Sequence, residues 1–395
     1  MSDEAAIERA KRAFGPSWRP ELISRAPGRL ELLGNHVDYN GGPVLAAAID
    51  RFVTASACAN RESVGTTRLL AIDLDQDVAT VNTLNPSVGD VDAATTPADY
   101  LGGILQALHE SELPARDGKE IVVTGDVPLG FGMSSSAALC VALTNLLADT
   151  ELSSSQIVDI ARRAEHLTGA PVGAMDQSAS VAGGVILFDG ATGEVTPINP
   201  ELGNRVFAVA NSGVYHALNQ SAYPTRVRES QQALDALRIH GHPELRRLTD
   251  LDSATWQTLR ADDLSWLPSP LPDRVDHVVS ETDRVRQGVA AIEHQDWVEF
   301  GELMSASGRS SAISYDISHP VVEELVSILM SLPGVLGARM MGGGEGGPAL
   351  ALLHEDAVED IKKELDESFF TRHDLEPEQS LKVCTFGPGA SLGPQ

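Results

Sequence analysis

The stretch Gly125-Asp-Val-Pro-Leu-Gly-Phe-Gly-Met-Ser-Ser-Ser-Ala-Ala-Leu139 combines flexible glycines, three successive hydroxyls and the start of a helix. The β-branched run at residues 120–124 before it predicts a strand, and the Ala- and Leu-rich segment 137–148 after it has helical spacing. The loop therefore opens a helix, whose first N–H groups can bind an anion. Gly130 and Gly132 allow the backbone to come close to that anion.

Three serines of this loop add side-chain ligands. The hydroxyls of Ser134, Ser135 and Ser136 can bond phosphate oxygens or coordinate a magnesium ion. The loop lacks the lysine of a P-loop and does not match the dinucleotide-binding fingerprint. A plain Gly/Ser connection between strand and helix is the alternative, but three serines running into two alanines make a phosphate-binding loop the more specific interpretation.

Three segments resemble motifs of the GHMP small-molecule kinases, in the order that the family has them. Residues 125–139 are similar to the motif P-x-x-x-G-L-S-S-S-A-A. Residues 26–42, Ala-Pro-Gly-Arg-Leu-Glu-Leu-Leu-Gly-Asn-His-Val-Asp-Tyr-Asn-Gly-Gly, resemble the galactokinase signature P-G-R-[VI]-N-[LI]-[IL]-G-E-H-T-D-Y-N-G-G. Residues 337–347, Gly-Ala-Arg-Met-Met-Gly-Gly-Gly-Glu-Gly-Gly, resemble G-[AS]-R-M-T-G-[AG]-G-F-G-G. Shorter matches, which favour the galactokinase branch, lie at residues 173–177, 211–216, 221–226 and 277–281.

The composition limits the partners and the compartment. The chain has 395 residues, 42% of them hydrophobic, and a formal net charge of −27. Nucleic acids and anionic membranes are bound by basic surfaces, so we expect neither as a partner. The N-terminal segment is acidic and no apolar stretch is long enough to span a bilayer, which favours a cytoplasmic protein. The three cysteines, too few for a disulfide framework or a zinc site, are expected to be buried thiols: Cys58, Cys140 and Cys384.

The resemblance implies a two-lobed α/β (α+β) GHMP kinase fold with the active site in the cleft between the lobes. The expected N-terminal α/β lobe covers residues 1–205, and the expected C-terminal lobe, with a ferredoxin-like sheet, covers residues 206–395. Further strands are predicted at 44–57, 184–188 and 381–385 and on both sides of Gly342, and helices at 156–167, 225–237, 274–293 and 320–332.

Two residues carry the chemistry that the resemblance implies. Asp176, in a turn at residues 173–177, matches the family's general base, which accepts the proton of the sugar's anomeric hydroxyl or holds that hydroxyl in line. Arg29 matches the arginine that orients this base and stabilises the transferred phosphoryl group. The alternative is that Asp176 and Arg29 only form an ion pair.

The implied cofactors are ATP and Mg²⁺. Ser136 and Glu165, the latter on a helix that ends at Gly169, match the family's magnesium ligands. Glu165 could instead be a solvated helix acid. The ATP phosphates would be bound by Gly130, Gly132, Ser134, Ser135 and Ser136, and would be covered from the other lobe by Gly343 and Gly344. The alternative for the latter segment, residues 342–347, is a glycine-rich hairpin without a ligand.

The implied sugar site is the part in which this chain departs most from the family. Its candidate residues are Asn35, His36, Asp38, Gly173 and Tyr223, of which Tyr223 could also be a core aromatic. Asn35 stands where the signature has Glu and Val37 where it has Thr, and Cys140 and Glu345 are further departures. The kinase chemistry is therefore more firmly indicated than the sugar.

Three functions fit these observations. The first is an ATP-dependent galactokinase that makes α-D-galactose 1-phosphate. The second is a sister sugar 1-kinase for another galacto-configured sugar such as galacturonate, because the neutral Asn35 does not repel a C6 carboxylate. The third is a non-catalytic sugar and ATP sensor, which the intact Ser-Ser-Ala-Ala element disfavours. The expected partners are a small sugar and ATP, with the protein a monomer or a weak homodimer.

Overall fold

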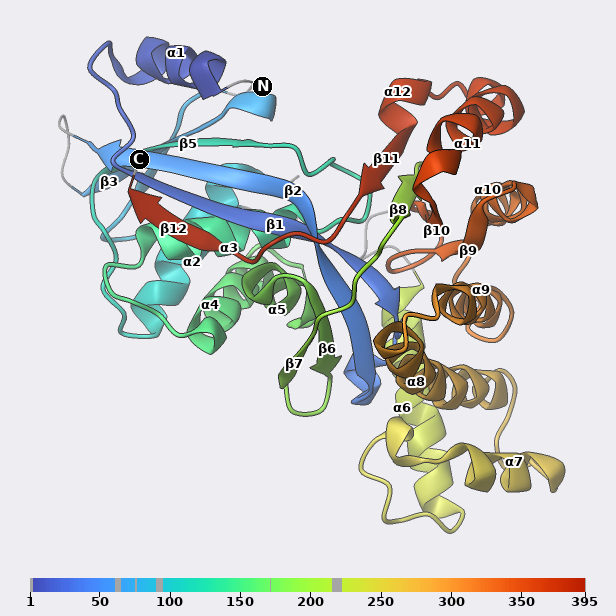
Figure 1. Cartoon of the computed structure of the whole chain (residues 1–395). Helices are drawn as coiled ribbons and strands as arrows, with labels where there is room; N and C mark the ends of the chain where they lie inside the picture. Colours follow the sequence, from blue (N-terminus) through green and yellow to red (C-terminus); the bar gives the residue numbers. More distant parts are fainter. Residues whose placement is uncertain are drawn as a thin grey trace.

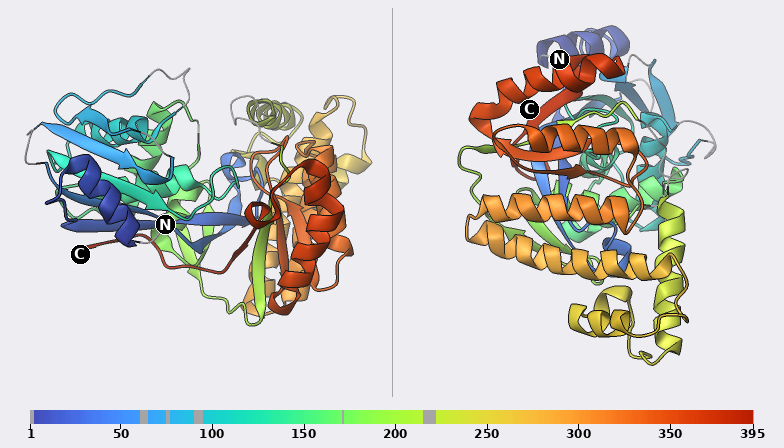
Figure 2. Two further views of the ribbon diagram at one scale, coloured as in Figure 1. Left: turned by 90° about the horizontal axis from the view of Figure 1, so that it is seen from above. Right: turned by 90° about the vertical axis from the view of Figure 1, so that its right-hand side faces the viewer.

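The computed structural model describes residues 3–60, 65–74, 77–89, 95–170, 172–214 and 222–394. Its frame consists of two β-sheets that lie beside each other, each with its own helices (Figure 1). The left view in Figure 2 separates the blue-to-green half of the chain from most of the yellow-to-red half. The strands β1 and β2 extend from the first sheet toward the helices α8 and α9 of the second half.

The first sheet is largely antiparallel, and its long strand β2 forms its centre. The strand order is β12-β1-β2-β5-β3-β4, with β6 and β7 joined to the other end of β2, and among the described strand pairs only β3 and β5 run parallel. Its strands are β1 (Leu22–Leu33), β2 (Pro43–Ala59), β3 (Thr66–Ala71), β4 (Ala79–Asn82), β5 (Lys119–Gly125), β6 (Val185–Asp189), β7 (Val195–Ile198) and β12 (Ser391–Pro394).

Both faces of this sheet are covered because its strands carry apolar side chains on both sides. In β5, Ile121 and Val123 point toward the main core, whereas Val122 points to the opposite face, against α1. The helices on the main face include α3, which is buried along almost its whole length. The helices of this half are α1 (Asp3–Phe14), α2 (Pro97–Glu110), α3 (Ser135–Leu147), α4 (Ser154–Leu167) and α5 (Met175–Ala182).

The second sheet is antiparallel, with the order β11-β8-β10-β9. Helices α9 and α10 pack against β9, and α8 packs against α9 (Figure 1). The strands are β8 (Arg205–Ala210), β9 (Val335–Met340), β10 (Ala349–His354) and β11 (Leu381–Cys384). The helices are α6 (Tyr223–Ile239), α7 (Ser253–Ala261), α8 (Leu271–Glu293), α9 (Trp297–Ile313), α10 (Pro320–Ser331), α11 (Val358–Leu365) and α12 (Pro377–Ser380).

The expected elements are present, with ends shifted by a few residues. The sequence patterns did not give the strands β1, β3, β4, β7, β8 and β12 or the helices α1, α2, α5, α7, α9, α11 and α12. The sheets change between β7 and β8, but the last strand, β12, returns to the first sheet and pairs with β1. The division into lobes at residues 205 and 206 stays a prediction. Among the helices of the described ranges, none combines the length and the apolar character that crossing a bilayer requires.

Candidate active site

The predicted phosphate-binding loop, residues 125–139, has the backbone geometry that its glycines predict. Gly130 and Gly132 have φ angles of 78° and 62°, and Ser134, at the N-cap of α3, has a φ angle of 53°. All three angles lie in the left-handed region, which glycine adopts without strain. The hydroxyl of Ser134 makes no cap hydrogen bond within α3 and instead donates to Asp176 Oδ2. The loop thus brings the start of α3 directly to the predicted base.

Arg29 and Asp176 lie together at this point. Arg29 Nε donates to Asp176 Oδ1 over 2.7 Å, Nη2 donates to Oδ2 over 2.8 Å, and Nη1 donates to the carbonyl of Gly132 over 2.5 Å. The strand carrying Arg29 passes close to the loop, since the Arg29 N–H donates to Met133 O over 3.0 Å. The expected turn at Asp176 is wrong: Asp176 is the second residue of α5, and no side chain caps this helix to mark its start.

Glu165 is buried, although it is a charged residue on a helix. It is 2% exposed, and Gln177 Nε2 donates to its Oε2. Burial raises the pKa of Glu165 to about 7, while hydrogen bonding by Ser136 and Gln177 opposes the rise. The alternative of a solvated acid is therefore wrong. Within the described ranges, no Lys, Arg or His lies within ion-pair distance of this carboxylate, and no cluster of three or more His, Cys, Asp or Glu is arranged to hold a metal.

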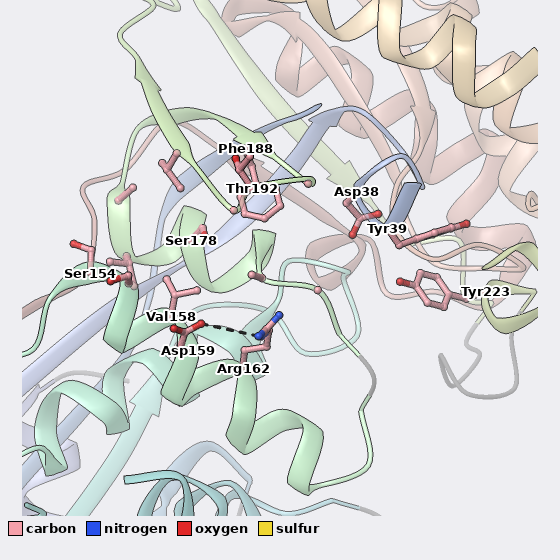
Figure 3. Close-up of a pocket in the computed structure, with 18 residues that line it drawn as sticks. Asp38, Tyr39, Ser154, Val158, Asp159, Arg162, Ser178, Phe188, Thr192 and Tyr223 are labelled. Atoms are coloured by element: carbon pink, nitrogen blue, oxygen red, sulfur yellow. Dashed lines mark ion pairs between the residues drawn. The ribbon is translucent and has the colours of Figure 1, made fainter. Parts of the chain in front are cut away.

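Three of the predicted sugar residues line one end of a cavity of about 750 Å³ (Figure 3). Figure 3 shows Asp38 and Tyr223 at the same end of this cavity, with Tyr39 beside them. Gly173 lies against the first of these, because a Cβ at position 173 would be 3.0 Å from Asp38 Oδ2. Burial raises the pKa of Asp38 to about 6, and the charges of Glu31 and Asp176 add to the rise.

His36 packs among aromatic rings next to this cavity. Its ring centre is 5.2 Å from that of Tyr223 and 5.3 Å from that of Tyr315, and its Nδ1 is 2.9 Å from Tyr39 Oη. The Tyr39 hydroxyl in turn lies 2.8 Å from that of Tyr315. Burial lowers the pKa of His36 to about 3, so its ring is neutral near pH 7. The tyrosines at 39 and 315 were not among the predicted site residues.

Asn35 is buried, and its side chain is already hydrogen-bonded within the protein. Its Nδ2 donates to Glu31 Oε1 over 2.9 Å and to Gly342 O over 3.1 Å, and its Oδ1 accepts from Ser311 over 3.2 Å. Both amide hydrogens are thus in use, and at most one lone pair of Oδ1 is left for a ligand. A direct contact of Asn35 with a sugar stays a prediction.

The turn that carries Asn35 to Asp38 is held by α8. Glu281 Oε1 accepts from the Gly34 N–H over 2.9 Å, and its Oε2 accepts from Arg284 over 2.6 Å. Burial alone would raise the pKa of Glu281, but Arg284 and His277 hold it at about 2. His277 Nε2 bonds to the carbonyl of Asn35 over 2.9 Å. The resemblance at residues 277–281 was noted from the sequence, but this contact was not foreseen.

The residues on both sides of the glycine segment 342–347 approach the predicted phosphate-binding loop. A Cβ at Gly132 would be 3.3 Å from Pro348, which follows the segment, and 3.7 Å from Met341, which precedes it. Gly343 and Gly344 are partly exposed.

A second cavity, of about 400 Å³, is lined by Ser135 and Ser136 together with apolar side chains of β5 and α3. This lining suits an apolar ring joined to phosphates. Of the segments 211–216 and 221–226, residues 215, 216 and 221 lie outside the described residues.

Comparisons with known proteins agree with this geometry. The galactokinase galactose-binding signature matches residues 11–58, the GHMP kinase N-terminal domain matches residues 99–184, and the GHMP kinase C-terminal region matches residues 289–371. The galactokinase of Homo sapiens is 32% identical over 375 residues, which cover 92% of each chain. The chain belongs to the galactokinase family.

Other relatives extend this result. The galactokinase of Roseiflexus sp. (strain RS-1) is 32% identical over 372 residues, covering 92% of this chain and 90% of that protein. The crystal structure of Lactococcus lactis galactokinase complexed with galactose superimposes with a TM-score of 0.85 at 25% identity, covering 98% of this chain and 99% of that one. A mevalonate kinase shares the fold, with a TM-score of 0.65 at 16% identity. The predicted class of ATP-dependent sugar kinase with the GHMP fold is confirmed.

Proposed function

We propose that this galactokinase-family protein transfers the γ-phosphoryl group of ATP to the anomeric hydroxyl of galactose, which gives α-D-galactose 1-phosphate and ADP. The observation that carries the proposal is the position of Asp176. Its carboxylate is bonded to Ser134 of the phosphate-binding loop, and the helix α5 that carries it follows Gly173, at the end of the sugar cavity. A base at this junction can reach a sugar hydroxyl next to the γ-phosphate.

Each side chain at this junction has a separate task in the proposal. Asp176 accepts the proton of the anomeric hydroxyl or holds it in line with the phosphorus atom. Arg29 fixes the plane of that carboxylate through two hydrogen bonds, and its positive charge stabilises the transferring phosphoryl group. Gly130, Gly132 and the serines of the loop bind the phosphates from one side, and Gly343 and Gly344 cover them from the other.

The residues present fit a magnesium ion. Glu165 is a buried carboxylate next to neutral hydrogen-bond partners, and Ser136 contributes a hydroxyl oxygen. Magnesium in kinases takes few protein oxygens and completes its shell with phosphate oxygens and water, so two ligands suffice. We propose that Ser136 and Glu165 hold the ion. When bound, it supplies positive charge against the charge that develops on the phosphates.

The sugar would lie at the end of the cavity formed by Asp38, Gly173 and Tyr223. A carboxylate that accepts hydrogen bonds from two neighbouring hydroxyls discriminates between epimers, because the wrong epimer leaves a buried group unpaired. His36, neutral and fixed among aromatic rings, would contact the sugar or shape its pocket. Asn35 would contribute at most through its Oδ1.

An assay of ADP release against a set of sugars tests this function. We expect turnover with galactose, product identification as the α-1-phosphate by phosphorus NMR, and turnover that is nearly abolished in the Asp176→Asn protein. The set includes galacturonate, N-acetylgalactosamine, glucose and arabinose. A wild-type protein that binds ATP and galactose but releases no ADP would instead be the sensor, and faster turnover of galacturonate than of galactose would favour the sister kinase.

The structure provides no separate support for the galacturonate kinase. The neutral Asn35 suggested it, but Asn35 is bonded to the carboxylate of Glu31, so a negative charge remains next to this position.

Two further expectations stay predictions, namely the cytoplasmic location and the monomer or weak homodimer. Cell fractionation and light scattering of the purified protein test them.

A further inference from the structure

Glu31 and Asn35 form a pair that the galactokinase signature has in the opposite order. The signature places Asn at position 31 and Glu at position 35, whereas this chain has Glu31 and Asn35. The two side chains are in direct contact, since Asn35 Nδ2 donates to Glu31 Oε1 over 2.9 Å. Compared with the signature, this chain therefore carries the carboxylate at position 31 instead of position 35, and the two side chains still contact each other.

The charge of Glu31 is balanced from the second sheet. Arg339, on β9, is fully buried, and its Nη2 donates to Glu31 Oε1 over 2.9 Å and to Glu31 O over 2.7 Å. Arg339 Nε and Nη1 are buried and have no hydrogen-bond partner among the described residues. Glu31 is thus the carboxylate that Arg339 contacts, and removing one member of a buried ion pair leaves the other charge uncompensated.

Asn35 connects Glu31 to the glycine segment through hydrogen bonds of its side-chain amide. The amide that donates to Glu31 also donates to Gly342 O over 3.1 Å, at the start of residues 342–347. Ser311 of α9 donates to the amide oxygen and fixes its orientation. One side-chain amide thus joins the turn of the predicted sugar site to the segment that would cover the phosphates.

Glu31 also lies near the reacting groups. Arg29 and Glu31 are two residues apart on β1, so their side chains share one face of the strand. The charge of Glu31 acts on Asp38 and Tyr223 as well, since it contributes to the upward shift of the pKa of both. Of the two carboxylate oxygens of Glu31, only Oε1 has hydrogen-bond partners among the described residues, and the side chain is 11% exposed.

We propose that Glu31 is a positioning residue for the sugar: held by Arg339, it fixes Asn35 and through it the turn at residues 35–38 and the segment 342–347. The inference rests on the proposed galactose kinase function. It also assigns Glu31 and Asn35 as an exchanged pair, in which each residue is tolerated only because the other is present. Neither residue can then be changed alone without disturbing sugar binding.

A double-mutant cycle tests the exchanged pair. The four proteins are the wild type, Glu31→Asn, Asn35→Glu and the double variant, which restores the order of the signature. Glu31→Asn leaves Arg339 without its carboxylate, and Asn35→Glu places a second carboxylate against the first. We expect each single change to raise the galactose KM by roughly 10- to 100-fold, and the double variant to return to within about 5-fold of the wild type.

Further measurements separate positioning from loss of structure. In every variant that folds, the galactose KM should rise more than the ATP KM, because Asn35 lies in the turn of the predicted sugar site but reaches the glycine segment through a single hydrogen bond. A merely structural role would lower kcat through the active fraction and leave the galactose KM unchanged. Glu31→Gln keeps the size and an acceptor oxygen but removes the charge, so it serves where Glu31→Asn does not fold. We expect it to raise the galactose KM by roughly 5-fold. Glu151→Asn, at an exposed site, is the matched control and should match the wild type.

Each outcome of these experiments either supports or overturns the proposal. Recovery in the double variant supports the proposal. A double variant whose galactose KM equals the product of the two single effects overturns it and leaves the proposed function intact, as does a Glu31→Gln protein with wild-type KM. A wild-type protein that releases no ADP with galactose overturns the proposed function first, and the sugar role of Glu31 falls with it.

Discussion

Arg29 binds the carboxylate of Asp176 through two parallel hydrogen bonds, from Nε to Oδ1 and from Nη2 to Oδ2. This geometry fixes the plane of the carboxylate, and the third donor, Ser134, occupies Oδ2 from the phosphate-binding loop. The carboxylate therefore cannot rotate away from the junction of the proposed sugar cavity and the loop without breaking three contacts. A carboxylate fixed in this way suits the general base that we propose, in a reaction in which orientation supplies most of the rate.

Replacement of Asp176 by Asn should lower kcat by roughly 100- to 10,000-fold, because the amide cannot accept the proton of the sugar hydroxyl. ATP affinity should stay close to that of the wild type, since the carboxylate acts on the nucleophile. Steady-state kinetics and calorimetric titration with ATP measure the two effects. Asp235→Asn, on the exposed side of α6, is the control. Retention of more than a tenth of the wild-type kcat would assign the base to another group.

Replacement of Ser136 by Ala should raise the magnesium concentration that gives half-maximal rate by roughly 10-fold, through loss of one oxygen ligand. The maximal rate at saturating magnesium should change less. A magnesium titration at fixed ATP provides the measurement, with Ser265→Ala at an exposed position as the control. A titration curve that coincides with that of the wild type removes Ser136 from the ligand set.

Replacement of Glu165 by Gln should stabilise the metal-free protein above neutral pH. The folded-state pKa of about 7 lies above the usual 4.5, so ionisation in the folded protein costs stability as pH rises from about 4.5 to 7 and by a constant amount above that. Gln carries no charge, and we expect a gain of about 2–3 kcal/mol at pH 8 and little at pH 5. Denaturant unfolding at both pH values measures it.

The same Glu165→Gln variant should need more magnesium for activity than the wild type. A stabilising change that weakens a functional ligand is the usual compromise at an active site. The magnesium titration therefore uses this variant too. Equal unfolding free energies for the two proteins at pH 8 contradict the assigned burial of the charge.

Galactose should bind more weakly below about pH 6. Asp38 has a folded-state pKa of about 6, above its usual 3.8, so it is ionised and able to accept two hydrogen bonds only at higher pH. His36, with a pKa of about 3, stays neutral throughout and contributes nothing to this dependence. We expect the dissociation constant to rise about 10-fold per pH unit below 6.

Equilibrium binding of galactose without nucleotide between pH 5 and 8 measures this dependence, and Asp38→Asn should bind weakly at every pH in that range. Circular dichroism at pH 5 verifies that the protein is folded. A wild-type dissociation constant that does not vary with pH would mean that Asp38 does not face the sugar as a carboxylate.

Local sequence patterns predicted the elements whose signals lie within a few residues. The loop that opens α3 is one example, because glycine and serine positions dictate both the turn and the helix start. Glu165 shows a signal that could have been used: it follows Ala161 by four residues and lies next to Ala164, on the buried stripe of α4. The helical spacing thus already indicated a buried carboxylate.

Other features had no local signal. The start of α5 carries no capping side chain, so Asp176 was expected in a turn. The strand β1 contains Pro27 and Gly28, which are typical of loops, and its pairing with β2 is irregular between Pro27 and Arg29. Asn35 bonds to Gly342, 307 residues later in the chain, and only the folded structure shows that its amide is in use.

The pairing of β12 with β1 means that one edge of the first sheet is completed late in the synthesis of the chain. Residues 391–394 pair with residues 22–25 of β1, so the outer edge of the first sheet at that place stays open until residues 391–394 have been translated. An open strand edge is a template for pairing with other chains. During translation, the ribosome-bound protein therefore exposes an aggregation-prone edge that its own last strand closes, and removal of residues 391–394 would make that exposure permanent.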